Sequence, residues 1–292
     1  MSFISYLVNG ISLGSIYALI ALGYTMVYGI AKMLNFAHGD VIMIGGFTVF
    51  IAISSLSFPV WLSILVGIIV CTLLGVIIEK VAYKPLRNAS PLAVLITAIG
   101  VSYLLQNTAL LIFGSDSKSF VSVVGLKDWK INDQLVISGV TIVTILVSLA
   151  IMILLTLFVN KTKPGRAMLA VSEDKGAAQL MGINVNSTIS LTFAIGSALA
   201  AVAAVLLCSA YPQINAYTGS MPGIKAFVAA VFGGIGSIPG AMIGGILLGI
   251  IENLSKAYIS SQMADAIVFA VLIIVLLVKP TGILGKKINE KV

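Results

Sequence analysis

Residues 233–240 read "GGIGSIPG" and interrupt an apolar stretch that extends from residue 223 to residue 251. Proline removes a backbone donor, and glycine destabilises a helix interior by about 1 kcal/mol relative to alanine. Four glycines, a proline and a serine within these eight residues therefore predict a helix break in the middle of the stretch. Without the break the stretch would be long enough to cross a membrane, so the break decides how the chain is threaded.

The rest of the chain is also strongly apolar. Of its 292 residues, 59% are hydrophobic and only 9% are charged, whereas soluble domains carry about 25% charged residues. Runs without Asp, Glu, Lys or Arg cover residues 1–31, 41–78, 91–114, 136–159, 188–211 and 226–251. About 20 residues of helix cross a ~30 Å hydrocarbon core, where backbone amides find no partner outside the helix. We therefore expect an all-α polytopic membrane protein.

The few charged residues predict which loops lie on which side of the membrane, and they do not indicate a charged partner such as nucleic acid. The formal charge is +7, but the basic residues are spread over short loops without forming a continuous stripe, which argues against nucleic acid as a partner. Cys71 and Cys208 lie in apolar runs and are expected to pack as small hydrophobic groups, with neither a disulfide nor a metal site. Because the first charge is Lys32, residues 4–29 are predicted to be a retained helix and not a signal peptide.

Loops rich in Lys and Arg mark the inner side of a membrane protein. The excess of these residues lies in 79–90, in 160–187 and in the tail from residue 279. The loops predicted to lie outside are 53–59, 115–135 and 212–222. Single crossings that alternate between the two sides are then predicted at 60–78, 91–114, 136–159 and 188–211.

The last two apolar segments, 223–251 and 257–278, must connect an outer loop to an inner tail. That connection needs an odd number of crossings, so one of the two segments cannot be a simple span. The break at 233–240 identifies which one: residues 223–232 are predicted to enter from outside, and residues 241–251 to return. The side of the N-terminus stays open, because no charge precedes Lys32.

A second polar breach, "NFAHGD" at residues 35–40, lies in the first half of the chain. Met43-Ile44-Gly45-Gly46 follows this breach, and the same tetrapeptide recurs after the other one as Met242-Ile243-Gly244-Gly245. We therefore predict a single transmembrane domain of about eight to ten membrane-inserted helices in two pseudo-repeated halves. The predicted halves are 1–135 and 136–292, with broken or re-entrant helices near 32–40 and 233–240.

Paired helix breaks commonly line a transport pathway, where protein or water satisfies the unwound backbone. In the first break, Asp40 is expected to N-cap a helix that begins at Val41, and His38 to hold the loop in place. The predicted pathway residues are Asn35, His38, Gly39, Asp40, Gly234, Gly236, Ser237 and Gly240.

Residues 160–187 form the longest inner loop. Four apolar residues recur in it among small and charged ones, which predicts a short amphipathic helix that ends at Gly182. These four are Met168, Val171, Leu180 and Met181. An ordinary solvated connector is the alternative, but exposed apolar side chains beside Glu173 and Asp174 favour a docking element for a partner.

Three blocks of sequence carry a family resemblance. They read "GSIYALIALGYTMVYGIAKMLNFAHGDVIMIGGF" at 14–47, "GRAMLAVSEDKGAAQLMGINV" at 165–185 and "FGGIGSIPGAMIGGILLGIIENL" at 232–254. In this order they resemble the signature blocks of the branched-chain amino acid ABC importer permeases of the LivH type. The resemblance covers nearly the whole chain, but urea and short-amide permeases share it, so they remain the alternative for the substrate.

The resemblance implies a permease subunit of an ATP-driven importer in a bacterial or archaeal cytoplasmic (inner) membrane. It implies as partners a second permease subunit of the LivM type, two ATP-binding cassette subunits and an extracytoplasmic substrate-binding protein. It also makes 160–187 the cytoplasmic coupling loop to the ATPase. The coupling residues that it implies are Arg166, Glu173, Asp174, Gly176 and Gly182.

ATP binding is expected on the partner chains. A P-loop ends in Gly-Lys followed by Ser or Thr, whereas the single Gly-Lys pair here, Gly285-Lys286, is followed by Lys287. We therefore expect no catalytic residue, metal or cofactor in this chain, and ATP with Mg²⁺ on the ATPase subunits.

Two other function classes can be built from the sequence. Residues 10–14, "GISLG", fit the G-x-S-x-G pattern of a serine hydrolase with His38 as the base, but they lie in an apolar stretch rich in small residues, which is typical of helix packing.

An ion-coupled secondary transporter could use a relay of ionisable residues. All of these residues lie at the edge or breach of an apolar run, where helix capping or snorkelling is sufficient to explain them. These residues are Lys32, His38, Asp40, Lys225 and Asp265.

Overall fold

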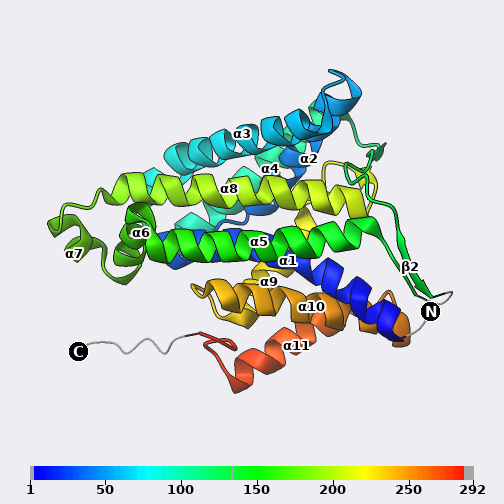
Figure 1. Ribbon diagram of the computed structural model, residues 1–292. Coiled ribbons are helices and arrows are strands. Elements are labelled where there is room, and N and C mark those ends of the chain that lie inside the picture. The colour runs from blue at the N-terminus through cyan, green and yellow to red at the C-terminus, as the bar shows by residue number, and fades with distance from the viewer. Residues whose placement is uncertain (1–2, 88, 133–134, 286–292) are drawn as a thin grey trace.

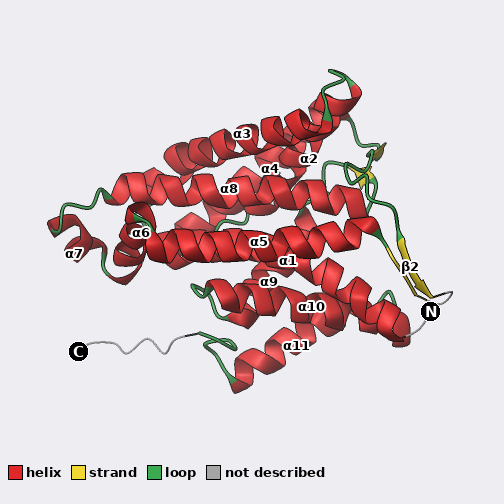
Figure 2. Cartoon of the chain, viewed as in Figure 1, coloured by secondary structure: helices red, strands yellow, loops and turns green. Residues whose placement is uncertain are grey.

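The chain folds into a bundle of apolar helices (Figures 1 and 2). This computed structural model describes residues 3–87, 89–132 and 135–285; the tail lysines from Lys286 on and the outer-loop Asp133 lie outside these ranges. Among the described residues, six helices are long and apolar enough to cross a membrane. They are α1 (Phe3–Ala31), α3 (Val60–Ile78), α4 (Pro91–Phe113), α5 (Gly139–Lys161), α8 (Val185–Ala210) and α10 (Ile238–Tyr258).

Shorter elements complete the bundle. Three apolar helices have fewer than 18 residues: α2 (His38–Ser54), α9 (Ser220–Gly233) and α11 (Ala264–Val278). The connections contain the π-helical turn η1 (Glu79–Tyr83), the 3-10 turn η2 (Lys84–Leu86), α6 (Lys163–Glu173) and α7 (Lys175–Leu180). The strands are β1 (Lys118–Ser119), β2 (Trp129–Asn132), β3 (Leu135–Ile137) and β4 (Gln213–Ile214). The predicted all-α polytopic fold is confirmed.

The loops gather at two opposite ends of the bundle, as the alternation of basic loops predicts. One end, here called the outer end, carries the start of α1, the β2–β3 hairpin and the antiparallel pairing of β1 with β4, in which Lys118 lies opposite Ile214 (Figure 1). The other end, the inner end, carries α6 and α7. The start of α1 therefore lies on the same side as the loops predicted to be outside, a side that the sequence leaves open.

Helix α1 runs through the centre of the bundle because its small residues allow close neighbours. Gly10 and Gly14 lie against the backbone of Ile250 and Ile246 on α10, and Gly249 of α10 lies against Gly14. Gly10 and Gly14 of α1 are four residues apart, as are Gly245 and Gly249 of α10, and these glycines form a small-xxx-small contact, which brings two backbones together in a membrane. By contrast, α3, α4 and α5 are largely exposed at the periphery of this single chain, where apolar side chains suit lipid.

The first predicted helix break is confirmed. Helix α1 ends at Ala31, Lys32 takes a left-handed conformation with φ 59°, and α2 begins at His38 beside Gly23 of α1. Gly23 precedes the end of α1 by eight residues, so the chain returns about 12 Å into the bundle before α2 starts.

The expected role of Asp40 as an N-cap is wrong. The N-cap of α2 is Ala37, without a side-chain hydrogen bond, and Asp40 lies inside the first turn. Its carboxylate instead accepts a hydrogen bond from the amide of Gln106 on α4, at 2.8 Å. A partner that is distant in sequence has drawn the side chain away from the helix end.

The second predicted break is also confirmed. Helix α9 ends at Gly233, Gly234 and Gly236 take positive φ values of 104° and 92°, and Ser237 caps α10 by accepting a hydrogen bond from the backbone N–H of Gly240. Residues 220–233 and α10 form the predicted inward and returning arms. Because α10 continues to Tyr258, the returning arm is a full crossing and is longer than the predicted 241–251.

Each copy of the repeated tetrapeptide lies near the start of a helix that follows a break, Met43 in α2 and Met242 in α10. The two helices differ in length, with 17 residues in α2 and 21 in α10. The division into halves at 1–135 and 136–292 stays a prediction.

Candidate translocation site

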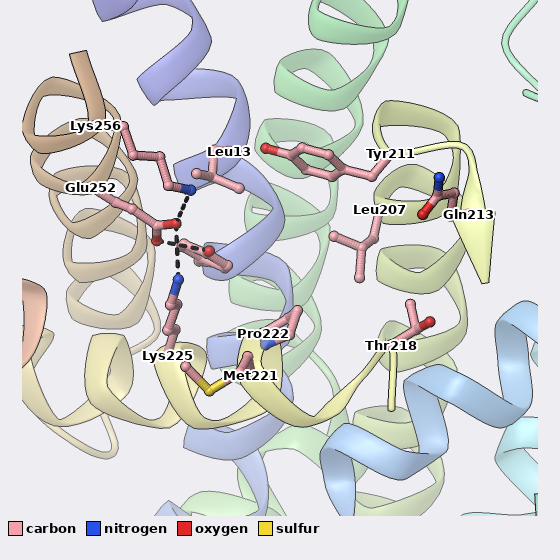
Figure 3. Close-up of a pocket in the computed structure, with 11 residues that line it drawn as sticks. Leu13, Leu207, Tyr211, Gln213, Thr218, Met221, Pro222, Lys225, Glu252 and Lys256 are labelled. Carbon is pink, nitrogen blue, oxygen red and sulfur yellow. Dashed lines mark hydrogen bonds and ion pairs between the residues drawn. The ribbon is translucent and has the colours of Figure 1, made fainter. Parts of the chain in front are cut away.

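A cavity of about 260 Å³ opens between α1, α8, α9 and α10, toward the outer end (Figure 3). One part of its wall is apolar and consists of Leu13, Leu207, Met221 and Pro222. The other part is polar and charged, and belongs to an ion-pair network that is centred on Glu252.

Glu252 of α10 is 1% exposed and has three partners. Its Oε1 atom accepts from the ammonium groups of Lys225 at 2.9 Å and Lys256 at 2.5 Å, and its Oε2 atom accepts from the Tyr17 hydroxyl at 2.9 Å (Figure 3). Lys225 of α9 also pairs with Asp265 of α11 at 2.7 Å. Two ammonium groups and two carboxylates balance, so the network is formally neutral.

Four ionisable groups on membrane helices need an explanation. Charged side chains at membrane depth are costly and normally face a water-filled cavity or another protein chain. Lys225 and Glu252 are buried, but the Lys256 and Asp265 side chains are 39% and 42% exposed in this single chain. The face that carries the cavity therefore faces water or a partner and not the lipid.

Sequence reasoning named Lys225 and Asp265, as members of an ion relay, but missed Glu252, Lys256 and Tyr17. A usable signal was present, because Glu252 and Lys256 are four residues apart, the spacing at which side chains meet on a helix. The predicted returning arm ended at residue 251, directly before this pair.

A groove of about 620 Å³ lies next to the cavity at the outer end. It is formed by residues 117–119 before and in β1, together with Tyr211, Pro212 and Gln213. Tyr211 and Gln213 line both the groove and the cavity, so the two are neighbours.

The first set of predicted pathway residues lies deeper, outside the lining of the cavity. Asn35, His38, Gly39 and Asp40 are all buried. The Asn35 side-chain oxygen accepts from the Tyr83 hydroxyl at 2.9 Å, and Gly39 lies against Gly219 at the start of α9. Gly39 thus brings the start of α2 next to the start of α9 inside the bundle, and Asn35 connects the first break to η1.

His38 is fully surrounded by other residues. Its ring lies edge-on to the ring of Tyr24, with centroids 4.7 Å apart, and its Nε2 atom has no hydrogen-bond partner among the described residues. The imidazole lies against Gly23, eleven residues along α1 from Ser12, which corresponds to about 16 Å. The serine and histidine of the hydrolase alternative are therefore not brought together, and Ser12 lies within continuous helix.

The five residues of the ion-relay alternative also fall into separate places. Lys225 and Asp265 pair with each other in the outer network, Asp40 pairs with Gln106, and Lys32 is exposed at the end of α1. No continuous chain of titratable groups connects them among the described residues.

The second set of predicted pathway residues lies at the inner end. Gly236 lies against Gly29 in the last part of α1, close to the first break. Residues of the tail cover the end of α9, because the backbone N–H groups of Ile283 and Leu284 donate to the carbonyls of Phe232 and Gly233 at 2.9 Å. The second break, with Gly234, Gly236, Ser237 and Gly240, thus lies at the inner end beside the end of α1, opposite the cavity.

The inner loop contains two helices and not the single amphipathic helix expected. Asp174 is extended, with φ −152°, and its carboxylate accepts from the backbone N–H groups of Gly176 and Ala177 at 2.7 and 3.0 Å. It therefore N-caps α7 and separates α7 from α6, in keeping with the preference of Asp for such positions. Gly182, with φ 80°, follows α7 as the predicted terminating glycine.

The apolar residues of this loop divide between the two helices. Met168 and Val171 of α6 are buried against the bundle, whereas Leu180 and Met181 are 90% and 82% exposed. In Figure 1, α7 projects beyond the end of α5. Arg166, Glu173 and Gly176 are exposed as well, so all five predicted coupling residues lie on an accessible surface.

Lys175 connects this projecting element to the first helix break. Its ammonium group donates to the carbonyl of Ala31, the last residue of α1, at 3.1 Å. Burial, followed by the nearby charges of Arg87 and Lys32, lowers the pKa of Lys175 from its usual value. A movement of α7 would therefore be transmitted to the end of α1, where the first helix break begins.

Comparisons with known proteins agree with this architecture. The family described as the permease component of the branched-chain amino acid transport system matches residues 6–276. The high-affinity branched-chain amino acid transport system permease protein LivH of Escherichia coli K12 is 49% identical over 304 residues, covering 99% of this chain and 98% of LivH. BraD of Pseudomonas aeruginosa PAO1, with the same description, is 48% identical over 302 residues with the same coverage. A probable LivH of Methanocaldococcus jannaschii is 32% identical over 282 residues, covering 91% of this chain and 88% of the relative.

Proposed function

Because the chain belongs to the permease family of the branched-chain amino acid transport system, we propose that it forms part of the membrane pathway of an ATP-driven importer of branched-chain amino acids. The observation that carries this proposal is the similarity to LivH and BraD, which covers nearly all of the chain. In this proposal the chain acts with a second permease subunit, two ATPase subunits and an external substrate-binding protein.

The structure supports a pathway that starts at the outer cavity. The cavity and the neighbouring groove lie toward the outer end, where a binding protein would release its ligand, whereas the second helix break lies at the inner end, packed against the end of α1. Transport would then require this inner contact to separate after the outer cavity closes. Alternating access of this kind is the usual behaviour of transporters with discontinuous helices.

The proposed coupling element is α6 with α7. Exposed Leu180 and Met181 offer an apolar contact to an ATPase subunit, and Glu173 offers a charged one. Lys175 would transmit movement of α7 to Ala31, at the entrance of the first break. The buried Met168 fixes α6 to the bundle, so α7 is the part that would move with the partner.

Reconstitution of the complete complex into vesicles tests the function. We expect uptake of L-leucine that depends on ATP and on the binding protein, because the chain carries no P-loop of its own. The measured quantity is accumulated radiolabelled leucine with ATP or with a non-hydrolysable analogue inside the vesicles. Accumulation by this chain alone on a proton or sodium gradient would instead establish the secondary-transporter alternative, and ATP-driven uptake of urea but not of leucine would establish the short-amide alternative.

A cysteine cross-link tests the coupling contact. We expect Leu180→Cys to cross-link to an ATPase subunit, because this side chain is 90% exposed on the projecting α7. Leu180 is a better position than Asp174, whose side chain caps α7. The measurement is a shifted band that contains both chains after treatment with a short bifunctional thiol reagent.

The matched control is Ala89→Cys, an exposed residue of the other inner loop, between η2 and α4. We expect it to give no more than a small fraction of the cross-linked product. Equal products from the two positions would show that α7 is not the specific contact.

A further inference from the structure

We propose that the outer cavity is a transient binding site for the zwitterionic form of an apolar amino acid, with Lys256 binding the carboxylate and Glu252 binding the ammonium group. This inference rests on the proposed function and adds a ligand site within the permease itself. It is carried by the polarity of the wall, by the volume and by the access route.

The polar part of the wall offers both halves of a zwitterion receptor. The Lys256 ammonium group has one partner, Glu252, among the described residues, and its side chain is 39% exposed, so donors remain for a carboxylate. Within the described part of the chain, Glu252 Oε2 accepts a single hydrogen bond, from the Tyr17 hydroxyl, which leaves acceptor capacity for an ammonium group. The Tyr211 ring extends across the cavity toward this pair (Figure 3).

The charge balance selects a neutral ligand. Lys225, Lys256, Glu252 and Asp265 sum to zero formal charge, so a zwitterion would add none. A simple cation or anion would leave an uncompensated charge at membrane depth, where such a charge is costly.

The apolar part of the wall suits an aliphatic side chain. Leu13, Leu207, Met221 and Pro222 border the cavity, and Leu207 on α8 lies across it from Glu252 and Lys256 (Figure 3). A cavity of about 260 Å³ corresponds to about nine waters at ~30 Å³ each. Leucine has nine non-hydrogen atoms, which are covalently bonded and therefore need less room than nine separate waters, so the cavity is large enough for one such molecule.

The ligand would reach the site from the outer end, where Tyr211 and Gln213 border both the cavity and the neighbouring groove. This position places the site directly after release from an external binding protein and on the opposite side from the second helix break.

Protection of a cysteine tests the site in the complete complex without the binding protein. In Met221→Cys, alkylation by N-ethylmaleimide at this position is followed by mass spectrometry; the native Cys71 and Cys208 are buried and should not react. We expect L-leucine to slow the reaction. We expect 4-methylpentanoate, 3-methylbutylamine and glycine, each lacking one of the three recognised groups, to need at least about tenfold higher concentrations.

A second substitution in the Met221→Cys background identifies the carboxylate partner. Lys256→Met should raise the leucine concentration for half-protection at least about tenfold, while Lys256→Arg, which keeps the charge, should raise it much less. Lys127→Met, an exposed lysine of an outer loop, serves as the control and should change nothing.

The outcomes separate the site from the function. If the complex takes up leucine with ATP but leucine gives no protection, or protects Lys256→Met as well as the parent, the site is refuted and the function stands. If glycine protects as well as leucine, the role of the apolar wall is refuted. Absence of ATP-driven leucine uptake by the parent complex would refute the proposed function itself.

Discussion

Replacing Gly249 by alanine is expected to prevent the chain from folding stably in the membrane. A Cβ atom at this position would collide with the backbone N and Cα atoms of Gly14 and with the carbonyl of Gly10. Backbone atoms cannot move aside as a flexible side chain can, so α1 and α10 would have to separate. Overpacking of this kind costs about 1–3 kcal/mol in ordinary cores, and a backbone collision in the central contact should lie at or above the upper end.

The matched control is Gly100→Ala on α4, where an added Cβ would meet nothing within 4 Å. Alanine favours helix over glycine by about 1 kcal/mol, so this substitution should be neutral or stabilising. For each variant, the fraction of solubilised complex that stays monodisperse is measured as a function of temperature, which gives an apparent melting temperature. Similar apparent melting temperatures for Gly249→Ala and Gly100→Ala would contradict the close contact of α1 and α10.

The membrane fold could be predicted because its signals are local. Uncharged runs of sufficient length gave α3, α4, α5 and α8 near their observed bounds, since the cost of charge in lipid acts residue by residue. Both helix breaks were visible because glycine and proline disfavour helix wherever they occur. The position of α2 inside the bundle could not be predicted from the sequence. It depends on the absence of a side chain at Gly23, which makes room for His38.

The polar contacts could not be predicted, because they join residues that are distant in sequence. Asp40 has a residue type and position typical of an N-cap, yet Gln106 of α4 binds its carboxylate and Ala37 takes the cap position. The partners of Lys225 lie on α10 and α11, and only the folded bundle brings the three helices together. The site predicted at the breaks and the cavity observed at the outer end differ for this reason.

Asp174 shows how one residue divides a loop that was expected to contain a single helix. Its carboxylate caps α7, which separates a part fixed by Met168 from a part that presents Leu180. The role of Asp174 as a contact residue for a partner stays a prediction, since its side chain is exposed as well as capping. In the proposed coupling role, two elements with different exposure would allow α7 to move while α6 stays fixed to the bundle.

Replacing Glu252 by glutamine is expected to destabilise the chain strongly. Glutamine keeps the shape of the side chain, but it removes the charge that faces both Lys225 and Lys256. Breaking a buried ion pair by removing one partner typically costs about 3–5 kcal/mol, because the remaining charge is uncompensated. Asp265 still pairs with Lys225, and Lys256 is partly exposed, so we expect a loss of about 3 kcal/mol, seen as a lower temperature of irreversible unfolding.

A double-mutant cycle distinguishes the ion pair from general disruption. Lys225→Met should destabilise the parent chain, but should cost much less, or restore stability, in the Glu252→Gln background, with a coupling energy of about 1–3 kcal/mol. Glu173→Gln makes the same chemical change at an exposed position of α6 and should leave the unfolding temperature unchanged. If the two glutamine variants unfold alike, or if the effects of Lys225→Met and Glu252→Gln simply add, the network does not hold α9 and α10 together. Strong coupling would instead show that the same charges that form the wall of the outer cavity also hold α9 and α10 together.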